Sequence, residues 1–296
     1  MSARVFVTRR APEQGLALLR DAGFEVVVRP ADEACPRAEL FEGLRVADAL
    51  VPFVTDRIDR EALAAAPRLR VVACCSVGYD HVDVAAAAER GIRVTNTPGV
   101  LTDATAELTW ALILSAVRRV VPGDRQVREG RWVGWSPVCT YGFELRGKTL
   151  GVVGAGRVGS SVVRIGARGF GMRVVFTALR ERPSLEALGA VRKELDDLLA
   201  ESDVVTLHLP LNAETRGILG RERLARMKPG SVLVNTARGA LVDEAALAEA
   251  LRAGRPAAAG LACTRASPRC RRRCWRWRTS CCCRTWAARR RRRGSG

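Results

Sequence analysis

A glycine-rich turn between an apolar run and a helical stretch constrains the fold more than any other feature of this chain. Residues Thr149–Val153 form a β-rich apolar run, the turn G-A-G-R-V-G follows directly, and Ser160–Gly169 can form a helix. In such a unit Gly154 permits a tight turn, Gly156 lets the backbone approach a pyrophosphate, and Gly159 lets helix and strand pack closely. The helix N-terminus directs N–H groups at the phosphates. The spacing predicts a dinucleotide-binding unit; the alternative is an ordinary strand–turn–helix connection.

The end of the next strand bears on which dinucleotide is bound. A carboxylate there would bind the ribose 2′-hydroxyl of NAD, but the predicted strand Arg173–Thr177 ends without one. Arg180 and Arg182 follow closely, and a planar guanidinium matches phosphate oxygens. We therefore expect NADP, with Arg180 at its 2′-phosphate, and NAD as the alternative cofactor. The other interpretation is that both arginines are solvated loop charges.

Apolar runs alternate with helical stretches along most of the chain. This pattern is typical of parallel sheets covered on both faces, so the fold class is α/β with two Rossmann-like, doubly wound parallel-sheet domains. The turn signal at 96–99 separates a substrate (catalytic) domain, residues 1–97, from an NAD(P)-binding domain, residues 98–261. A long helix is expected over 102–121 and irregular structure over 122–147. Other strands are expected at 4–8, 24–28, 49–51, 69–73, 203–207 and 231–235.

Length and hydropathy argue against export and membrane insertion. The chain has 296 residues, and no apolar run approaches the roughly 20 residues that span a bilayer. The first residues, M-S-A-R-V-F-V-T-R-R, lack the apolar core and the small-residue cleavage site of a signal peptide. We expect a cytoplasmic protein without a membrane partner.

Residues 262–296 differ in composition from the rest of the chain. They hold 13 arginines, six of the ten cysteines and no acidic residue, and they supply most of the net charge of +18. An arginine tail with Trp275, Trp277 and Trp286 can bind RNA or DNA non-specifically, but the charge does not indicate a nucleic-acid-binding domain. A zinc site is disfavoured because adjacent cysteines do not easily serve one tetrahedral metal. We expect no specific nucleic acid, no metal and a disordered tail.

Four stretches carry recognisable motifs. They are C-S-V-G-Y-D-H-V-D (75–83), N-T-P-G-V-L-T-D-A-T-A-E-L-T-W-A-L (96–112), G-K-T-L-G-V-V-G-A-G-R-V-G (147–159) and M-K-P-G-S-V-L-V-N-T-A-R-G-A-L-V-D (227–243). Together they resemble the D-isomer-specific 2-hydroxyacid dehydrogenase family, most of all its glyoxylate/hydroxypyruvate reductase branch. The resemblance implies hydride transfer between a nicotinamide cofactor and a small 2-oxo acid, an active site between two domains, and a homodimer formed through the cofactor domain.

The resemblance also implies roles for individual residues. Arg238 matches the catalytic arginine, and its guanidinium can hold the carboxylate of a 2-oxo acid while it polarises the ketone. The N–H groups of Val77 and Gly78 are expected at the substrate carboxylate. The alternatives are a structural arginine and an ordinary strand-end turn. Beyond the three glycines and Arg180, the implied cofactor contacts are Arg157, Val158, Pro210, Thr215, Thr236 and Ala237.

A proton must be transferred together with the hydride, and the family supplies it from a histidine paired with a glutamate. The chain contains two histidines, His81 and His208, and neither occupies the position of this acid. The acid is expected beyond Leu261, where the family has D-V-x-E-x-E-P and then P-H-x-G-S-A-T. This chain has an arginine- and cysteine-rich ending in its place.

We interpret this ending as an out-of-frame translation of the family's own ending. Each original codon is taken as the third base of one residue plus the first two bases of the next. The junctions 274–275, 281–282 and 282–283 must then each give Leu, and the junction 286–287 must give Gly. The other junctions permit L-A-L-E-N-V-V-L-L-P-H-L-G-S-A-T over 274–290 and D-V-Y-E-G-E-P over 262–268. Both halves fall in one shifted frame, so the C-terminal return segment of the fold is expected to be missing or scrambled.

These observations lead to one main hypothesis and two alternatives. The main hypothesis is an NADP-preferring reductase of glyoxylate, hydroxypyruvate or a related 2-oxo acid, with poor turnover in the chain as written. The first alternative is an inactive, cofactor-binding pseudoenzyme. The second is a corepressor-like binding protein on the same fold.

Overall fold

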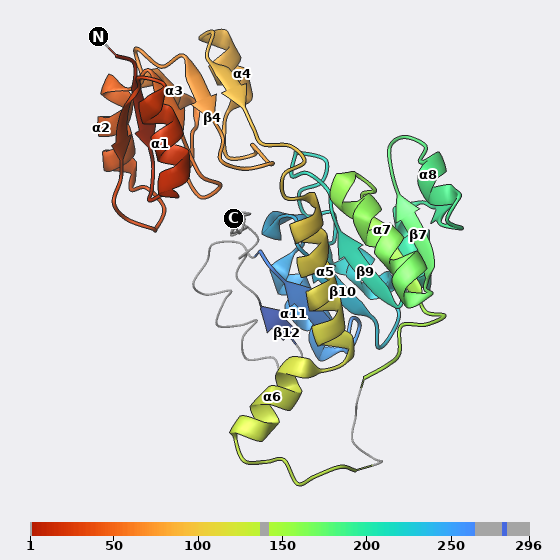
Figure 1. Cartoon of the computed structure of the whole chain (residues 1–296). Helices are drawn as coiled ribbons and strands as arrows, with labels where there is room; N and C mark the ends of the chain where they lie inside the picture. The colour runs from red at the N-terminus through yellow and green to blue at the C-terminus, as the bar shows by residue number, and fades with distance from the viewer. Residues whose placement is uncertain (1, 137–141, 264–279, 283–296) are drawn as a thin grey trace, which may run out of the picture. The chain divides into compact units, whose positions relative to one another are not determined.

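The structure is a computed structural model that describes residues 2–136, 142–263 and 280–282 (Figure 1). The chain divides into two compact units, Met1–Val100 and Leu101–Gly296. Each unit is built on one parallel sheet, so the predicted α/β class with two Rossmann-like sheets is confirmed. The division follows Val100, whereas the sequence placed the domain boundary after residue 97.

The first unit holds a five-stranded sheet in the order β2-β1-β3-β4-β5. Its strands are β1 (Arg4–Val7), β2 (Glu25–Val28), β3 (Ala49–Val51), β4 (Val71–Ala73) and β5 (Arg93–Thr95). Its helices are α1 (Glu13–Asp21), α2 (Arg37–Val46), α3 (Arg60–Ala64) and α4 (Val84–Glu89). The largest buried cluster of this unit contains Leu44, Leu50 and Leu63, each fully buried.

Aspartates begin two of these helices. Asp59 accepts a hydrogen bond from the N–H of Ala62 at 3.1 Å, and Asp83 accepts one from the N–H of Ala86 at 2.9 Å. Each carboxylate satisfies an N–H group that has no partner within its helix. These caps fix where α3 and α4 start.

The second unit holds a seven-stranded sheet in the order β12-β11-β10-β9-β6-β7-β8. Its strands are β6 (Thr149–Val153), β7 (Arg173–Thr177), β8 (Val191–Arg192), β9 (Val204–Leu207), β10 (Val232–Asn235), β11 (Ala258–Leu261) and β12 (Ser280–Cys282). Its helices are α5 (Thr102–Val117), α6 (Val120–Arg128), α7 (Arg157–Phe170), α8 (Pro183–Glu186), α9 (Leu195–Glu201), α10 (Arg221–Arg226), the 3-10 turn η1 (Gly239–Leu241) and α11 (Glu244–Arg252).

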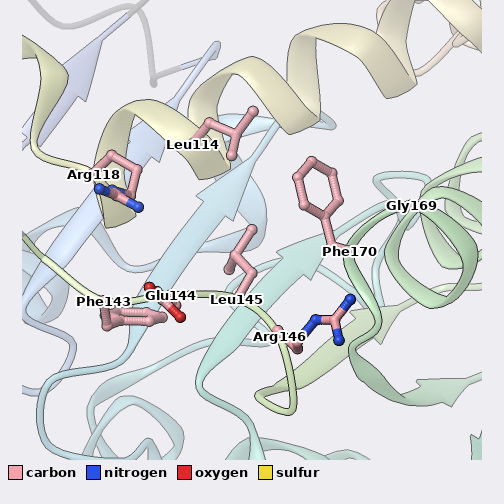
Figure 2. A pocket seen from close by; sticks show the side chains of 8 residues that line it. All are labelled: Leu114, Arg118, Phe143, Glu144, Leu145, Arg146, Gly169 and Phe170. Carbon is pink, nitrogen blue, oxygen red and sulfur yellow. The ribbon is translucent and has the colours of Figure 1, made fainter.

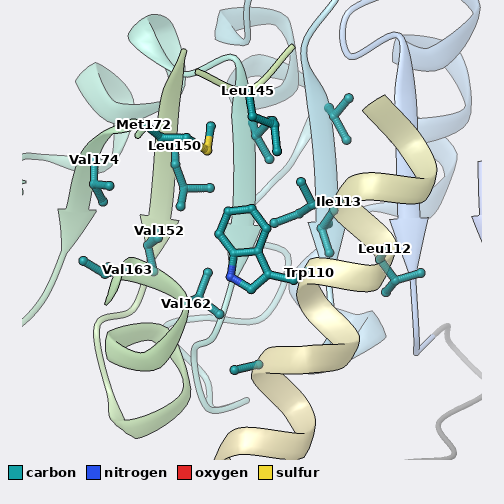
Figure 3. Close-up of a cluster of buried hydrophobic side chains, with 14 of the residues drawn as sticks. Trp110, Leu112, Ile113, Leu145, Leu150, Val152, Val162, Val163, Met172 and Val174 are labelled. Atoms are coloured by element: carbon teal, nitrogen blue, oxygen red, sulfur yellow. The ribbon is translucent and has the colours of Figure 1, made fainter. Parts of the chain in front are cut away.

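One of the two buried clusters of the second unit lies where α5 and α7 cover β6. Figure 3 shows the Trp110 ring on α5 among side chains of β6 and α7, including Leu150 and Val162. Trp110 stacks on Phe170 with ring centroids 4.5 Å apart. A Cβ on Gly166 would lie 2.7 Å from a methyl group of Leu150, so this glycine allows α7 to approach the sheet closely. This packing therefore fixes the position of α5 against the sheet and α7.

The region after α5 differs from the expectation. The predicted helix over 102–121 ends at Val117. A second helix, α6, begins at Val120 and extends to Arg128, into the stretch 122–147 that was predicted to be irregular. Arg119 has a φ of 55°, a left-handed conformation that separates the two helices. Pro122 lies in the first turn of α6, where its missing N–H would have no partner within the helix in any case. The proline is therefore compatible with α6, which continues through residues 122–128, where the sequence suggested irregular structure.

Part of the tail that was expected to be disordered is ordered in the structure. Ala262 is buried, and Ser280–Cys282 form β12, which pairs in parallel with β11 so that Leu261 opposes Cys282. Without β12, β11 would be an edge strand with unpaired N–H and C=O groups, and backbone groups can pair with it whatever the side chains are. Residues 264–279 and 283–296, which carry the rest of the predicted tail, lie outside the described residues.

Candidate active site

The glycine-rich turn joins β6 to α7. Gly154 has a φ of 95°, and a Cβ there would lie 3.0 Å from the carbonyl carbon and oxygen of His208. A Cβ on Gly159 would collide with the carbonyl oxygen of Gly154. A Cβ on Gly156 would meet no atom within 4 Å, so the turn is open on that side. The turn thus leaves room for a ligand at Gly156 and none at the other two glycines.

Two hydrogen bonds tie this turn to the end of β7, and a third ties it to Arg182, which precedes α8. The Gly154 N–H donates to Oγ1 of Thr177 at 3.0 Å, and the Ala155 N–H donates to the Thr177 carbonyl at 2.9 Å. Nε of Arg182 donates to the Ala155 carbonyl at 2.9 Å. Arg182 is therefore part of the frame of the turn, whereas Arg180 is exposed beyond the strand end.

Helix α7 begins directly at the turn, with Arg157 as its first residue. The first N–H groups of a helix lack intrahelical acceptors and carry the positive end of the helix dipole. Arg157 is exposed and Val158 is half-buried at this end. The open side of Gly156, the helix terminus and the nearby arginine fit the pyrophosphate of a nicotinamide dinucleotide.

The segment after β9 forms a compact turn that contains Pro210 and Thr215. Oγ1 of Thr215 donates to the Pro210 carbonyl at 2.7 Å, and the Thr215 N–H donates to Oδ1 of Asn212 at 2.9 Å. The N–H of His208 donates to the carbonyl of Val153 at 2.8 Å, which continues the pairing of β9 with β6. Burial lowers the pKa of His208 to about 3, so its ring is neutral near pH 7. A neutral ring with so low a pKa is a poor proton donor.

The loop after β10 carries Thr236, Ala237 and Arg238. Nδ2 of Asn235 donates to the Arg238 carbonyl at 2.8 Å, and Oδ1 of Asn235 accepts from the Ala237 N–H at 3.0 Å. Nη1 of Arg238 donates to the Ala237 carbonyl at 3.0 Å. Asn235 is buried, so its amide acts as an internal brace that closes the loop.

Two residues outside the predicted set also contact this loop. Oγ1 of Thr236 lies 2.9 Å from Oγ1 of Thr109 on α5, and Sγ of Cys263 lies 3.6 Å from the carbonyl oxygen of Asn235. Asn235 and Thr109 were not among the predicted site residues. An asparagine at a strand end was an available signal, because its side chain favours local turns. A threonine within an apolar helix gave no comparable signal.

The glycine-rich turn, the turn after β9 and the Arg238 loop all follow the carboxyl ends of strands in the second sheet, and they lie on the same side of it. Val153 pairs in register with Leu207, and Leu207 pairs with Asn235, so the three strands end side by side. In open α/β sheets ligands bind outside the carboxyl ends of the strands. The structure therefore gathers the predicted cofactor residues of the second unit, together with Arg238, along one edge.

Val77 and Gly78 lie in the first unit, just beyond the carboxyl end of β4. Oγ of Ser76 donates to the Gly78 carbonyl at 2.7 Å, and Nδ2 of Asn96 donates to the Val77 carbonyl at 2.7 Å. Val77 is exposed. Among the residues described, neither N–H donates to a protein acceptor. Both N–H groups are thus available to an anionic ligand.

A separate hollow of about 300 Å³ lies at the opposite edge of the second sheet (Figure 2). Leu145 and Arg146 precede β6, Phe170 ends α7 and Arg118 follows α5, so all four lie near the amino end of β6. The hollow is therefore distinct from the edge that holds the glycine-rich turn.

Neither a candidate metal-binding cluster nor a membrane-spanning helix occurs in the part of the chain that the structure describes. Residues 2–136, 142–263 and 280–282 contain no cluster of three or more His, Cys, Asp or Glu side chains that could hold a metal ion. In the same ranges, no helix has the length and apolar character that crossing a membrane requires.

Comparison with known proteins adds independent evidence. Residues 110–282 match the family model of the D-isomer specific 2-hydroxyacid dehydrogenase NAD binding domain. A glyoxylate reductase from Aeropyrum pernix is 51% identical over 263 residues, which cover 87% of this chain and 78% of that relative.

Solved structures are similar over nearly the whole chain. The TT0316 protein from Thermus thermophilus has a TM-score of 0.86 at 47% identity and matches 95% of this chain and 88% of its own. A D-lactate dehydrogenase from Aquifex aeolicus, solved with NAD and lactic acid, has a TM-score of 0.85 at 30% identity, covering 95% of this chain and 87% of that chain.

Proposed function

The chain belongs to the D-isomer specific 2-hydroxyacid dehydrogenase family, and from this premise we propose that it reduces glyoxylate, hydroxypyruvate or a closely related 2-oxo acid. Membership makes it an oxidoreductase that acts on the CH–OH group of 2-hydroxy acids with a nicotinamide cofactor. The name of the Aeropyrum relative supports glyoxylate as a substrate. It also favours an enzyme over a corepressor-like binding protein.

The observation that carries this proposal is the register of β6, β9 and β10. It brings the open side of Gly156 and the loop of Arg238 to one sheet edge. A nicotinamide dinucleotide bound along this edge would supply the hydride. The turn and the first N–H groups of α7 would hold its pyrophosphate, and Pro210, Thr215, Thr236 and Ala237 would line its cleft.

Arg238 would bind the substrate carboxylate and polarise the ketone oxygen, which gains negative charge as the hydride arrives. Val77 and Gly78 of the first unit would offer their N–H groups to a carboxylate. A bidentate arginine suits this group, and so do two adjacent backbone donors, because each carboxylate oxygen can accept more than one hydrogen bond. This division of roles favours small 2-oxo acids as substrates.

We assign the cofactor as NADP, with NAD as the weaker ligand. Thr177 ends β7 where NAD-specific proteins carry a carboxylate, and the exposed Arg180 lies three residues beyond. A guanidinium there would pair with a 2′-phosphate. Because Arg182 already donates a hydrogen bond to the Ala155 carbonyl, Arg180 is the better candidate for binding the 2′-phosphate.

We further propose that two copies pair through the second unit. Val127 on α6 and the following Trp132, Val133 and Trp135 are all exposed. Exposed apolar residues that are grouped together often mark a surface that contacts another protein. Sedimentation of the full chain should give a dimer, and a Trp135→Ser, Val133→Ser double variant should shift it toward monomer.

Binding and turnover measured on the full chain test the proposed reaction. We expect NADPH to bind, oxalate to bind the NADPH complex, and glyoxylate and hydroxypyruvate to stimulate NADPH oxidation slowly but above buffer. Oxalate serves as the probe because it carries a carboxylate and a charged oxygen in place of the ketone. Arg238→Gln should weaken oxalate binding about 100-fold and leave NADPH binding in place.

A matched control is Arg192→Gln, which removes an exposed arginine from β8. It should change neither oxalate nor NADPH affinity. Equal oxalate affinities of the Arg238→Gln variant and the parent chain would overturn the proposed site.

A further inference from the structure

A hydrogen bond between two hydroxyls links the Arg238 loop to the middle of α5. Oγ1 of Thr236 lies 2.9 Å from Oγ1 of Thr109, and Thr109 donates to the carbonyl of Thr105 at 2.8 Å. A hydroxyl has one proton, so Thr109 has none left for Thr236. Thr236 is therefore the donor, and its side-chain orientation is fixed.

Thr109 lies in a part of α5 where an apolar side chain would serve packing better. It is fully buried, and its helix neighbours Trp110, Leu112 and Ile113 are buried as well. A buried hydroxyl costs free energy unless it is hydrogen-bonded, and valine has nearly the same shape without this cost. The bond to Thr105 satisfies the Thr109 proton, as in many helical threonines. It does not account for the second contact, which reaches a loop far along the chain.

The second contact complements the brace formed by Asn235. Asn235 bonds to the backbone of Ala237 and Arg238 and so fixes the internal shape of the loop. Thr109 holds the start of the same loop, at Thr236, against a helix that the core keeps in place (Figure 3). The two restraints act at opposite ends of a three-residue segment.

We propose that Thr109 is a positioning residue for Arg238. This inference rests on the proposed role of Arg238 at the substrate carboxylate. A bidentate guanidinium must be held within about 0.5 Å of its working position to bind well. The Thr109–Thr236 bond anchors the loop two residues before Arg238, so its loss lets the guanidinium move away from the carboxylate.

Oxalate affinity of the NADPH complex tests the proposal in the full chain. Thr109→Val removes the acceptor and keeps the shape, and it should weaken oxalate binding about fivefold, the value of one neutral hydrogen bond. Thr109→Ser restores the hydroxyl and should bind oxalate within about twofold of the parent chain. If Thr109 only stabilised the fold, oxalate affinity would follow the melting temperature. Recovery of oxalate affinity in Thr109→Ser, with the same melting temperature as Thr109→Val, would therefore indicate positioning.

Ser202→Ala is the matched control. Ser202 is also fully buried, and its hydroxyl also donates to the carbonyl four residues earlier, Leu198, at 2.6 Å. It lies after α9 and makes no contact with the Arg238 loop. The control removes a buried hydroxyl and its bond to a helix carbonyl, as Thr109→Val does, and it should leave oxalate affinity unchanged. Equal weakening of oxalate binding by Ser202→Ala and Thr109→Val would overturn the proposal.

A double-mutant cycle separates the bond from other effects of each residue. Thr236→Val breaks the same bond from the loop side and leaves the core of α5 intact, so it replaces Thr109→Val if that variant fails to fold. Both single variants break the same bond, so the double variant should bind oxalate no more weakly than the single variant with the lower oxalate affinity. If the fold-losses of the two single variants multiply in the double variant, the proposal is overturned.

Arg238→Gln, measured in parallel, distinguishes a failure of the proposed function from a failure of the role of Thr109. If it leaves oxalate affinity unchanged, the proposed function fails; if it abolishes binding while Thr109→Val has no effect, only this inference fails.

Discussion

Arg182 donates from Nε to the carbonyl of Ala155 at 2.9 Å, and this bond ties the segment between β7 and α8 to the glycine-rich turn that follows β6. A guanidinium used in this way shapes the turn whichever dinucleotide is bound. Arg180, two residues earlier, is exposed. The two arginines that the sequence offered together for the 2′-phosphate therefore have different structural settings.

Substitution of each arginine in turn should separate discrimination from general affinity. Arg180→Ala should weaken NADPH binding about tenfold and leave NADH binding unchanged, because only the 2′-phosphate loses a charged partner. Arg182→Ala should weaken both cofactors by a similar factor, about fivefold, because the turn itself loses a hydrogen bond. Fluorescence titration of both variants with both cofactors measures the four changes. Equal losses for NADPH and NADH in Arg180→Ala would remove the assignment of NADP specificity to this residue.

Two glycines of the same turn should respond to alanine in opposite ways. Gly159→Ala places a methyl group against the Gly154 carbonyl, and we expect about 2 kcal/mol of lost stability. Gly156→Ala places the methyl group in open space at a φ of −74°, which suits any L-residue, so stability should change by less than about 0.5 kcal/mol. NADPH affinity of Gly156→Ala should nevertheless fall at least about tenfold, because the methyl group occupies the expected path of the pyrophosphate.

Thermal unfolding and calorimetric titration of this pair give a clear contrast. The prediction requires a stable Gly156→Ala protein that binds NADPH poorly. A variant that binds NADPH as tightly as the parent chain would show that the pyrophosphate does not pass over Gly156.

The sequence predicted the fold well where local and long-range signals agree. Continuous apolar runs such as Thr149–Val153 could only be buried strands, and helical stretches between them required parallel pairing. The prediction failed at α6, because Pro122 is a helix breaker in most positions and only its place in the first turn makes it compatible. It also failed at Ser280–Cys282, where pairing with the free side of β11 depends on the backbone and not on composition.

The candidate site was predictable only as separate motifs. The tight turn at Gly154 and the close packing at Gly159 could be predicted, because each follows from a missing side chain. Thr109 was not identifiable, because its partner Thr236 is remote in sequence and no motif links them. No structural role could be predicted for Arg182, because sequence spacing does not reveal that its Nε reaches the Ala155 carbonyl.

His208 should make the folded chain less stable in acid. Its Nε2 pairs with the hydroxyl of Thr206, and burial lowers its pKa from 6.5 to about 3. Below pH 6.5 the unfolded chain therefore binds a proton that the folded chain does not, so stability falls as the pH falls. This group should cost about 2 kcal/mol at pH 5 relative to pH 8, and His208→Asn should remove that cost.

Tryptophan fluorescence can follow this effect in the right unit. All six tryptophans lie beyond residue 100, so urea unfolding monitored by their emission reports on the second unit. The difference in unfolding free energy between pH 8 and pH 5 should be smaller in His208→Asn than in the parent chain. Parallel pH dependence of the two proteins would mean that the imidazole titrates normally in the folded state.

The proton that must accompany the hydride needs a donor, and restoring the family's ending should supply one. Neither His81 nor His208 occupies the position of the family's acid, and the shifted-frame hypothesis locates the missing histidine in a P-H pair that the junctions 283–284 and 284–285 can encode. Restoring one base after the codon of Leu261 should return this pair and the D-V-Y-E-G-E-P segment. Turnover of glyoxylate with NADPH should then rise about 10²- to 10⁴-fold, the usual contribution of a positioned general acid. Replacing the restored histidine by glutamine should cancel the gain without changing NADPH affinity, which separates proton delivery from a general improvement of folding. Sequencing the gene decides the premise, since codons that cannot spell the family ending one base over would contradict it.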